Sequence, residues 1–239
     1  MGTQGHAKDI VVLSGKRTPF GTFGGSLKGF TATDLGVFSS VAAIEAALGA
    51  GTRLAGRRAL VTSGPTHEPI DPVRIITNRS SGKMGYALAE AARDRGAGVT
   101  LVAAPTSLPD PAGVDMEHVE SAREMRNAVL PACIDADLLV MAAAVGDFRA
   151  AEVADDKIKK DGSGRFSLSL VANEDWMSGA RGDRLVKVAF AAETSNLLEN
   201  ARAKLQSKGA SLVVANDVTE DGAGFGTDTN KVTILDGEG

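Results

Sequence analysis

The chain has one cysteine, few aromatic residues and no long apolar run. Cys133 alone cannot form an intramolecular disulfide or a multi-cysteine zinc site, and its isolation fits a reducing compartment. The longest apolar stretch, residues 138–145, is too short to cross a bilayer, and the first residues show no signal-peptide pattern. These absences predict a cytoplasmic protein that does not enter a membrane.

An excess of positive charge is also missing. The 26 Lys and Arg residues are outnumbered by 30 Asp and Glu residues, giving a net charge of −4, which argues against general binding to nucleic acid or membrane surfaces. An anionic substrate would therefore need a locally basic site. Since 43% of residues are hydrophobic but only 4% are aromatic, the core must be built from Ala, Val, Leu and Ile, as in parallel sheets covered by helices.

The pattern divides the chain into residues 1–52 and 53–239. Residues 9–50 predict a short appendage of strand, glycine-rich loop and helix. After residue 57, strand and helix signals alternate, which predicts an α/β fold with a doubly wound, Rossmann-like, mostly parallel sheet. The expected strands are 59–62, 99–103, 116–119, 138–142, 185–190 and 211–215, and the expected helices are 82–95, 122–133 and 196–208.

Several smaller features complete this expected fold. Residues 166–171 alternate like an exposed strand of a flap hairpin, and residues 231–235 fit an antiparallel edge strand. Ser121 and Glu124 form a capping-box pattern, and Thr194 is a plausible N-cap of the last helix. His118 is expected within a strand as a structural residue, and Cys133 in the core.

Ligands of such sheets bind beyond the carboxyl ends of the strands. The first strand is followed by a loop with three prolines and then by Ser80, Ser81, Gly82 and Lys83 at a helix start, where hydroxyls and amides could hold a phosphate or carboxylate. The other interpretation is an ordinary packed helix start. Neither the Walker pattern nor the three-glycine dinucleotide fingerprint is present.

Later segments supply further candidates. After the strand 138–142, Asp147 could bind a ribose hydroxyl or a metal-bound phosphate, or could cap a helix. Lys157, in a lysine cluster before a Gly/Ser turn, belongs either to a solvated hairpin or to a mobile basic flap over phosphates. Phe190 could stack on a base or pack in the core. Lys204 and Lys208 share one helix face, for which solvent exposure is the default.

Several segments together resemble one family. Residues 64–66, 68–74, 78 with 80–85, 157–160, 190–194 and 215–218 are similar, in order and spacing, to the bacterial phosphopantothenate–cysteine ligase domain. The resemblance covers residues 53–239. It implies that CTP activates the carboxylate of 4'-phosphopantothenate as an acyl-cytidylate, with Mg²⁺ present and pyrophosphate released. The amine of L-cysteine then displaces CMP. The residues alone do not distinguish CTP from ATP.

The resemblance also implies roles for individual residues. Asn78 would hold the acyl-cytidylate and Lys157 would reach phosphate from the flap, both as catalytic residues, while no protein metal ligand is implied. Ser80, Ser81, Gly82 and Lys83 would bind the substrate phosphate or carboxylate. The implied nucleotide site consists of Ala143, Ala144, Asp147, Lys157, Asn173, Asp175, Phe190, Lys204 and Lys208. The family acts as a homodimer, with the flap near the partner's site.

The chain departs from the family pattern at four places. Glu174 and Trp176 replace the usual Pro and aliphatic residue of a nucleotide-contacting segment, and Gly146 replaces the usual Ala. The family's last strand and helix would lie beyond Gly239. Residues 9–48 resemble the start of a thiolase, through residues 17–21, 23–28 and 33–36, where a flavin-dependent decarboxylase is expected. We interpret residues 1–52 as a non-catalytic appendage.

Two alternatives remain at this stage. A Rossmann-like oxidoreductase that binds NAD(P) would share the sheet pattern, but the missing glycine fingerprint counts against it. A non-catalytic nucleotide-binding remnant or scaffold would share both the fold and the motifs. The leading hypothesis is the CTP-dependent ligase.

Overall fold

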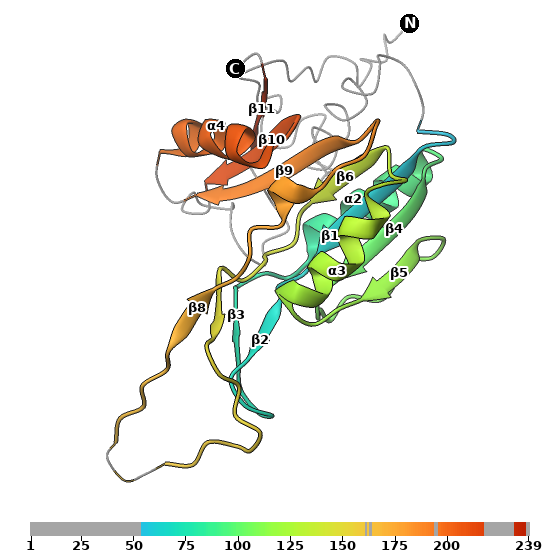
Figure 1. The fold of residues 1–239 in the computed structure, drawn as a ribbon. Helices are drawn as coiled ribbons and strands as arrows, with labels where there is room; N and C mark the ends of the chain where they lie inside the picture. Colours follow the sequence, from blue (N-terminus) through green and yellow to red (C-terminus); the bar gives the residue numbers. More distant parts are fainter. Residues whose placement is uncertain (1–53, 161, 163, 194–195, 218–231, 238–239) are drawn as a thin grey trace, which may run out of the picture.

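The computed structural model describes residues 54–160, 162, 164–193, 196–217 and 232–237. The predicted appendage, residues 1–52, and the expected cap Thr194 lie outside these ranges. Within them, seven strands form the central sheet in the order β11-β10-β9-β6-β1-β4-β5 (Figure 1). Their bounds are β1 Arg58–Ser63, β4 Gly98–Ala103, β5 Asp115–His118, β6 Leu138–Met141, β9 Val186–Glu193, β10 Leu212–Asp217 and β11 Val232–Asp236.

The sheet is parallel except at one edge. Neighbouring strands from β5 to β10 pair in parallel, and β11 pairs antiparallel with β10, which confirms the late antiparallel edge strand. The strand order runs from β1 outward through β4 and β5, and from β6 outward through β9 and β10. Its direction therefore reverses between β1 and β6, and this switch point is where a doubly wound sheet binds ligands.

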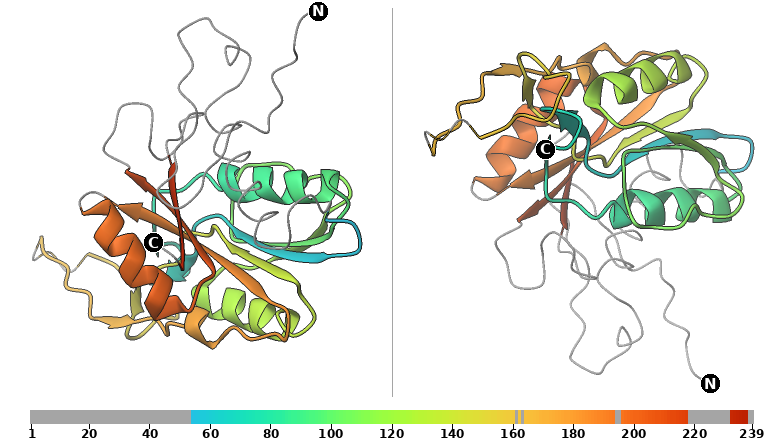
Figure 2. Two further views of the ribbon diagram at one scale, coloured as in Figure 1. Left: turned by 90° about the horizontal axis from the view of Figure 1, so that it is seen from above. Right: turned by 90° about the horizontal axis from the view of Figure 1, so that it is seen from below.

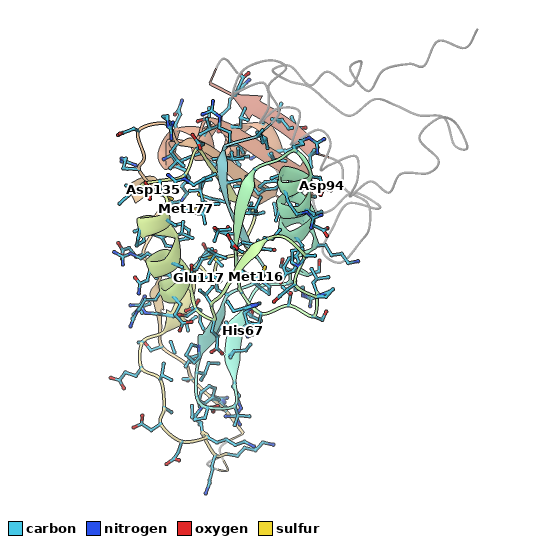
Figure 3. The ribbon with its side chains drawn as sticks, turned by 90° about the vertical axis from the view of Figure 1, so that its right-hand side faces the viewer. His67, Asp94, Met116, Glu117, Asp135 and Met177 are labelled. Atoms are coloured by element: carbon cyan, nitrogen blue, oxygen red, sulfur yellow. The ribbon has the colours of Figure 1, made fainter. Side chains whose placement is uncertain are left out.

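Three helices cover the two faces of the sheet. α2 (Lys83–Asp94) buries Leu88 and Ala89 against one face, and α3 (Ala122–Ala132) and α4 (Leu197–Lys208) lie on the other (Figure 2). Figure 3 views the β5 edge, with α2 and α3 on opposite sides of it. Both apolar clusters consist mainly of small aliphatic side chains, which agrees with the composition. The doubly wound α/β prediction is confirmed.

The predicted Ser121 cap of α3 is confirmed, while the Glu124 side chain reaches back one residue beyond the N-cap. The backbone N–H of Glu124 donates to Ser121 Oγ at 3.2 Å, and Glu124 Oε2 accepts from the backbone N–H of Glu120 at 2.8 Å. His118 differs from its prediction, since it ends β5, is exposed and pairs with Asp110 at 3.1 Å. None of the described helices combines the length and apolarity needed to span a membrane.

Two short antiparallel pairs lie beside the main sheet. β2 (His67–Pro69) pairs with β3 (Ile75–Thr77), inside the segment that we expected to be a stiff loop. β7 (Phe148–Ala150) pairs with β8 (Leu170–Ala172). The predicted strand 166–171 was therefore wrong in extent, because only its last two residues find a partner strand. We call the described residues between β7 and β8 (151–160, 162 and 164–169) the flap; it projects away from the central sheet (Figure 1).

Candidate functional site

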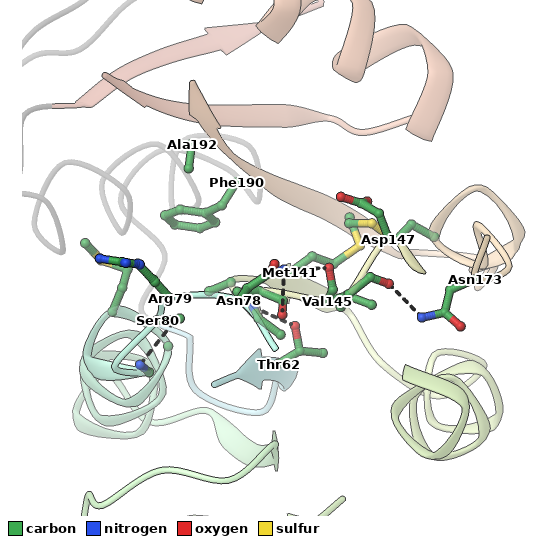
Figure 4. A pocket seen from close by; sticks show the side chains of 18 of the residues that line it. Thr62, Asn78, Arg79, Ser80, Met141, Val145, Asp147, Asn173, Phe190 and Ala192 are labelled. Atoms are coloured by element: carbon green, nitrogen blue, oxygen red, sulfur yellow. Dashed lines mark hydrogen bonds between the residues drawn. The ribbon is translucent and has the colours of Figure 1, made fainter. Parts of the chain in front are cut away.

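A cavity of about 640 Å³ opens at the carboxyl ends of β1, β6 and β9, at the switch point of the sheet. Its lining comes from Thr62 of β1, the start of α2, the segment after β6, the segment before the 3-10 helix Met177–Gly179, and side chains from β9, α4 and β10 (Figure 4). The lining residues are Thr62, 78–85, 141–147, 173–177, Phe190, Ala192, Lys204, Lys208 and Asn216.

Close packing places the start of α2 at the cavity. Gly82, with φ +75°, precedes the helix, and Ser63 Oγ donates to its carbonyl at 2.7 Å. A Cβ at Gly85 would lie 2.4 Å from Ser63 Oγ, so only glycine lets the helix approach β1 this closely. No side chain caps α2 and its first turn contains no acidic residue. The positive end of the helix dipole thus faces the cavity, which suits an anion.

Asn78 connects two loops of the site. It follows β3 directly, and its Nδ2 donates to the carbonyls of Val145 at 3.1 Å and Ala144 at 3.4 Å. The loop after β6 is itself anchored to the loop after β1, because Ala144 N–H donates to the Gly64 carbonyl at 2.9 Å. The amide group of Asn78 is therefore held in a defined orientation at the cavity wall.

Asp147 does not cap a helix, because the chain continues from it into β7. It is exposed at the cavity, and Asn173 lies beside the same segment, with Nδ2 donating to the Gly146 carbonyl at 2.8 Å. Space is limited at Gly146, where a Cβ would lie 3.3 Å from Glu68 Cγ. Glu68 is buried and accepts from the N–H of Ala122. Because this bond holds Glu68 in place, the absence of a side chain at Gly146 leaves room for it.

Two lysines of α4 reach the cavity, so the default interpretation of a solvated face was wrong. Lys204 Nζ donates to the Phe190 carbonyl at 2.5 Å, and Lys208 Nζ pairs with Asp175 at 2.6 Å. Phe190 is partly buried: it packs against the core and also lines the cavity. This position is compatible with both predicted roles, core packing and stacking on a base.

The two unusual residues of segment 173–176 have separate structural roles. Trp176 is 4% exposed and packs in the apolar cluster that includes Met125 and Val129 of α3. Glu174 pairs with Arg126 of α3 at 3.2 Å. Both contacts fix this cavity segment to α3, although sequence reasoning had considered these residues only as departures.

The cavity brings together all predicted site residues except Lys157. Lys157 is exposed on the flap and does not line the cavity of its own chain. Thr62 and Asn216 also line the wall, although neither was predicted as a site residue and Asn216 entered only within segment 215–218. The position of both at carboxyl ends of strands was a usable signal. Among the described residues, no group of three or more His, Cys, Asp or Glu side chains could hold a metal ion.

Cys133 is buried, as predicted, in the cluster under α3. Burial raises the pKa of its thiol to about 11, although the nearby charge of Lys187 acts in the opposite direction. A thiol with this pKa is almost entirely protonated at neutral pH and is a poor nucleophile. Cys133 therefore has a packing role.

Comparisons with known proteins agree with this geometry. Residues 54–239 match the family described as the DNA/pantothenate metabolism flavoprotein C-terminal domain. The protein named Coenzyme A biosynthesis bifunctional protein CoaBC from Mycolicibacterium smegmatis is 50% identical over 199 residues, which cover 78% of this chain and 48% of that protein. Its namesake from Vibrio vulnificus is 46% identical over 184 residues, covering 75% and 46%. The chain spans about half the length of these curated relatives.

Solved structures share the fold. The C-terminal domain of a CoaBC protein superposes with a TM-score of 0.66 at 40% identity, covering 79% of this chain and 86% of that one. A Cab2 mutant in complex with phosphopantothenate-cysteine superposes with a TM-score of 0.60, covering 84% of this chain and 85% of that one. Its 17% identity supports a common fold only.

Proposed function

Because the chain belongs to the DNA/pantothenate metabolism flavoprotein C-terminal domain family, we propose that it is the ligase of coenzyme A biosynthesis that joins 4'-phosphopantothenate to L-cysteine. The proposed nucleotide is CTP, and the proposed compartment is the cytoplasm. One observation carries this proposal. The switch-point cavity gathers an uncapped helix start, Asn78, Asp147, Phe190 and the two lysines of α4 around one space.

In the first step, a carboxylate oxygen of phosphopantothenate attacks the α-phosphorus of CTP, and pyrophosphate leaves. The start of α2 suits an anionic group of the substrates, since its N–H groups and dipole favour negative charge. Lys204 and Lys208 extend positive charge to the opposite wall. Lys208 would leave its ion pair with Asp175 and bind phosphate oxygens instead. The site would thus neutralise the phosphate charge without a large rearrangement.

In the second step, the cysteine amine attacks the acyl carbon, the amide forms, CMP leaves and a proton is released. Asn78 lines the cavity beside the loop after β6, and we assign it the role of contacting the reacting acyl phosphate. Its Nδ2 is already bonded to the Val145 carbonyl, which orients the side chain before substrate binds. Most of the rate enhancement then comes from positioning and charge stabilisation.

Mg²⁺ fits this site as an ion carried by the triphosphate. Three carboxylates line the cavity: Glu174 pairs with Arg126 and Asp175 with Lys208, whereas Asp147 has no ion pair among the described residues. Asp147 would therefore meet a phosphate-bound Mg²⁺ or its water, and the ion would neutralise phosphate charge when bound.

The apolar surface of the flap region supports a homodimer. Phe166 is 60% exposed, Phe148 52% and Leu170 46%, all near β7 and β8. Large exposed apolar side chains favour an interface over solvent. A partner there would also account for Lys157, which does not reach the cavity of its own chain and would instead enter that of the partner.

The decisive test is pyrophosphate release by the purified chain with CTP, Mg²⁺ and phosphopantothenate, followed by amide formation when cysteine is added. We expect both products, and ATP in place of CTP tests the nucleotide preference. A folded chain that binds CTP but releases no pyrophosphate would indicate a non-catalytic remnant. Binding of NADPH without binding of CTP would favour the oxidoreductase and contradict the proposal.

A further inference from the structure

One buried carboxylate connects the turn between β2 and β3 to the flap. The Asp71 side chain has no exposed surface, and each of its oxygens has two donors. Oδ1 accepts from the backbone N–H groups of Val73 and Arg74, both at 2.8 Å. Oδ2 accepts from the Arg74 guanidinium at 2.5 Å and from the N–H of Ile158 at 3.1 Å. Oδ1 thus organises the turn, while Oδ2 reaches across to the flap.

Two further bonds hold the same stretch of the flap. Arg74 Nη1 donates to the Ile158 carbonyl at 3.1 Å, and the N–H of Ala154 donates to the Ile70 carbonyl at 3.0 Å. Ile158 is therefore fixed through both its N–H and its carbonyl. The peptide unit that Asp71 binds is the one that joins Lys157 to Ile158, so the backbone of Lys157 is fixed as well.

The same hairpin leads directly to the cavity. β3 ends at Thr77, whose Oγ1 donates to the Thr66 carbonyl at 2.9 Å, and Asn78 follows. The turn that holds the flap and Asn78, which lines the cavity, thus belong to one short, hydrogen-bonded element. A shift of the flap relative to this hairpin would change the reach of Lys157.

We propose that Asp71 is a positioning residue of the reaction: together with Arg74 it clamps the flap at Ile158 and thereby fixes the place from which Lys157 reaches phosphate. This inference rests on the proposed function, which gives Lys157 its part. It applies equally whether Lys157 enters the cavity of its own chain or that of a partner, because the clamp lies within one chain.

Electrostatics agree with an ionised Asp71. Burial alone would raise the pKa of this carboxyl, but hydrogen bonds from the N–H groups of Val73, Ile158 and Arg74, together with the charge of Arg74, lower the pKa below its ordinary value.

Asn at this position is nearly the same size. Its oxygen can keep the two bonds that organise the turn, while its NH₂ group would face two donors. Asp71→Asn should therefore release the flap and keep the turn.

The test compares wild type with Asp71→Asn, Lys157→Ala and the double variant. Asp155→Asn is the control, since it makes the same chemical change at an exposed carboxylate of the flap. Two quantities are measured on the full chain: amide hydrogen exchange of the segment containing Ile158, and pyrophosphate release. We expect Asp71→Asn to speed exchange about tenfold. We also expect it to slow pyrophosphate release on the order of tenfold to a hundredfold, because moving a catalytic group by about 1 Å can reduce the rate by about this factor.

The double variant separates positioning from general damage. If Asp71 acts through Lys157, Asp71→Asn should slow wild type but have little further effect on Lys157→Ala. Unchanged exchange in Asp71→Asn would overturn the clamp. Faster exchange with undiminished pyrophosphate release, or equal losses in both backgrounds, would overturn the positioning role. A wild-type chain that releases no pyrophosphate would overturn the proposed function itself and the positioning role with it, whereas the exchange data would still report on the contact.

Discussion

At the scale of single residues, Asn78 is the most informative position. Asn78→Asp replaces a donor by a carboxylate that would face the Val145 carbonyl at 3.1 Å and the phosphate oxygens of the substrates. We expect overall ligation to fall on the order of a hundredfold to a thousandfold, as for a lost oxyanion donor, with the fold unchanged. The second step should suffer more, so acyl-cytidylate should accumulate when cysteine is present.

Separate assays of pyrophosphate and amide product measure the two steps. Asn127→Asp is the matched control, since Asn127 is exposed on α3 and does not line the cavity. Near-wild-type rates for both products in Asn78→Asp would mean that Asn78 only connects two loops.

Gly85 tests the close contact that brings α2 to the cavity. A methyl group at this position would lie 2.4 Å from Ser63 Oγ and 2.9 Å from the Thr62 carbonyl oxygen. Alanine gains about 1 kcal/mol in helix propensity over glycine, but overpacking against β1 costs about 1–3 kcal/mol and displaces the helix start. We therefore expect Gly85→Ala to weaken binding of CTP and to lower the midpoint of thermal unfolding.

Gly98→Ala is the control for Gly85→Ala, because the nearest atom to a Cβ at Gly98 is 4.0 Å away. Calorimetry and a CTP titration measure both variants. If both bind CTP as wild type does, the approach of α2 to β1 does not shape the site.

At the scale of elements, Asp137 holds the amino ends of β1, β6 and β9 together. Its Oδ2 accepts from the Arg58 N–H at 3.0 Å and Oδ1 from Arg57 at 3.1 Å, while Arg184 lies 3.4 Å away. The hydrogen bond from the Arg58 N–H lowers the pKa of this carboxyl against the effect of burial, with help from the two other arginines. The ionised form is therefore favoured by the fold.

The pH dependence follows from this direction. A carboxyl with a lowered pKa in the folded state stabilises the fold above its unfolded pKa of about 3.9, and this contribution disappears as the pH falls through the folded pKa. Asp137→Asn should lower the free energy of unfolding at pH 7 by about 1–3 kcal/mol, and the difference from wild type should shrink below about pH 4. Urea unfolding measures this difference. The measurements run from about pH 3, roughly one unit below the unfolded pKa, to about pH 7.

Asp135→Asn is the control for Asp137→Asn. The Asp135 side chain is 75% exposed and pairs with Arg58 at 3.4 Å, and exposed pairs contribute little. A difference between wild type and Asp137→Asn that stays constant over the whole pH range would contradict the assigned role of the charge.

At the scale of the whole molecule, the prediction for residues 1–52 remains to be tested. If this appendage is non-catalytic, its deletion should leave pyrophosphate release and amide formation unchanged, because the described residues that line the cavity all lie between positions 62 and 216. Activity assays and size-exclusion chromatography compare the two chains. A changed oligomer or lost solubility would assign residues 1–52 a structural role, such as adding a strand at a sheet edge. Thiolase activity of the intact chain would contradict both interpretations.

The sequence by itself determined the family, the order of the main strands and helices, and most of the cavity wall. Local periodicity reports which face of an element is buried, and a doubly wound sheet collects the residues after its strands at one edge. Asn78, Asp147 and Phe190 could therefore be assigned to one site, although they lie far apart in the chain. The cavity confirms that they meet, while their chemical roles stay predictions.

Only the tertiary structure decided the pairings that local patterns do not encode. β2–β3 and β7–β8 are ladders of three residues each, too short for a periodic signal. The bond from Ile158 to Asp71 joins positions 87 apart, and nothing in either segment indicates its partner. Lys208 is likewise directed into the cavity through Asp175. Such contacts depend on which segments the completed sheet brings together, and this is a property of the packed chain rather than of any window of sequence.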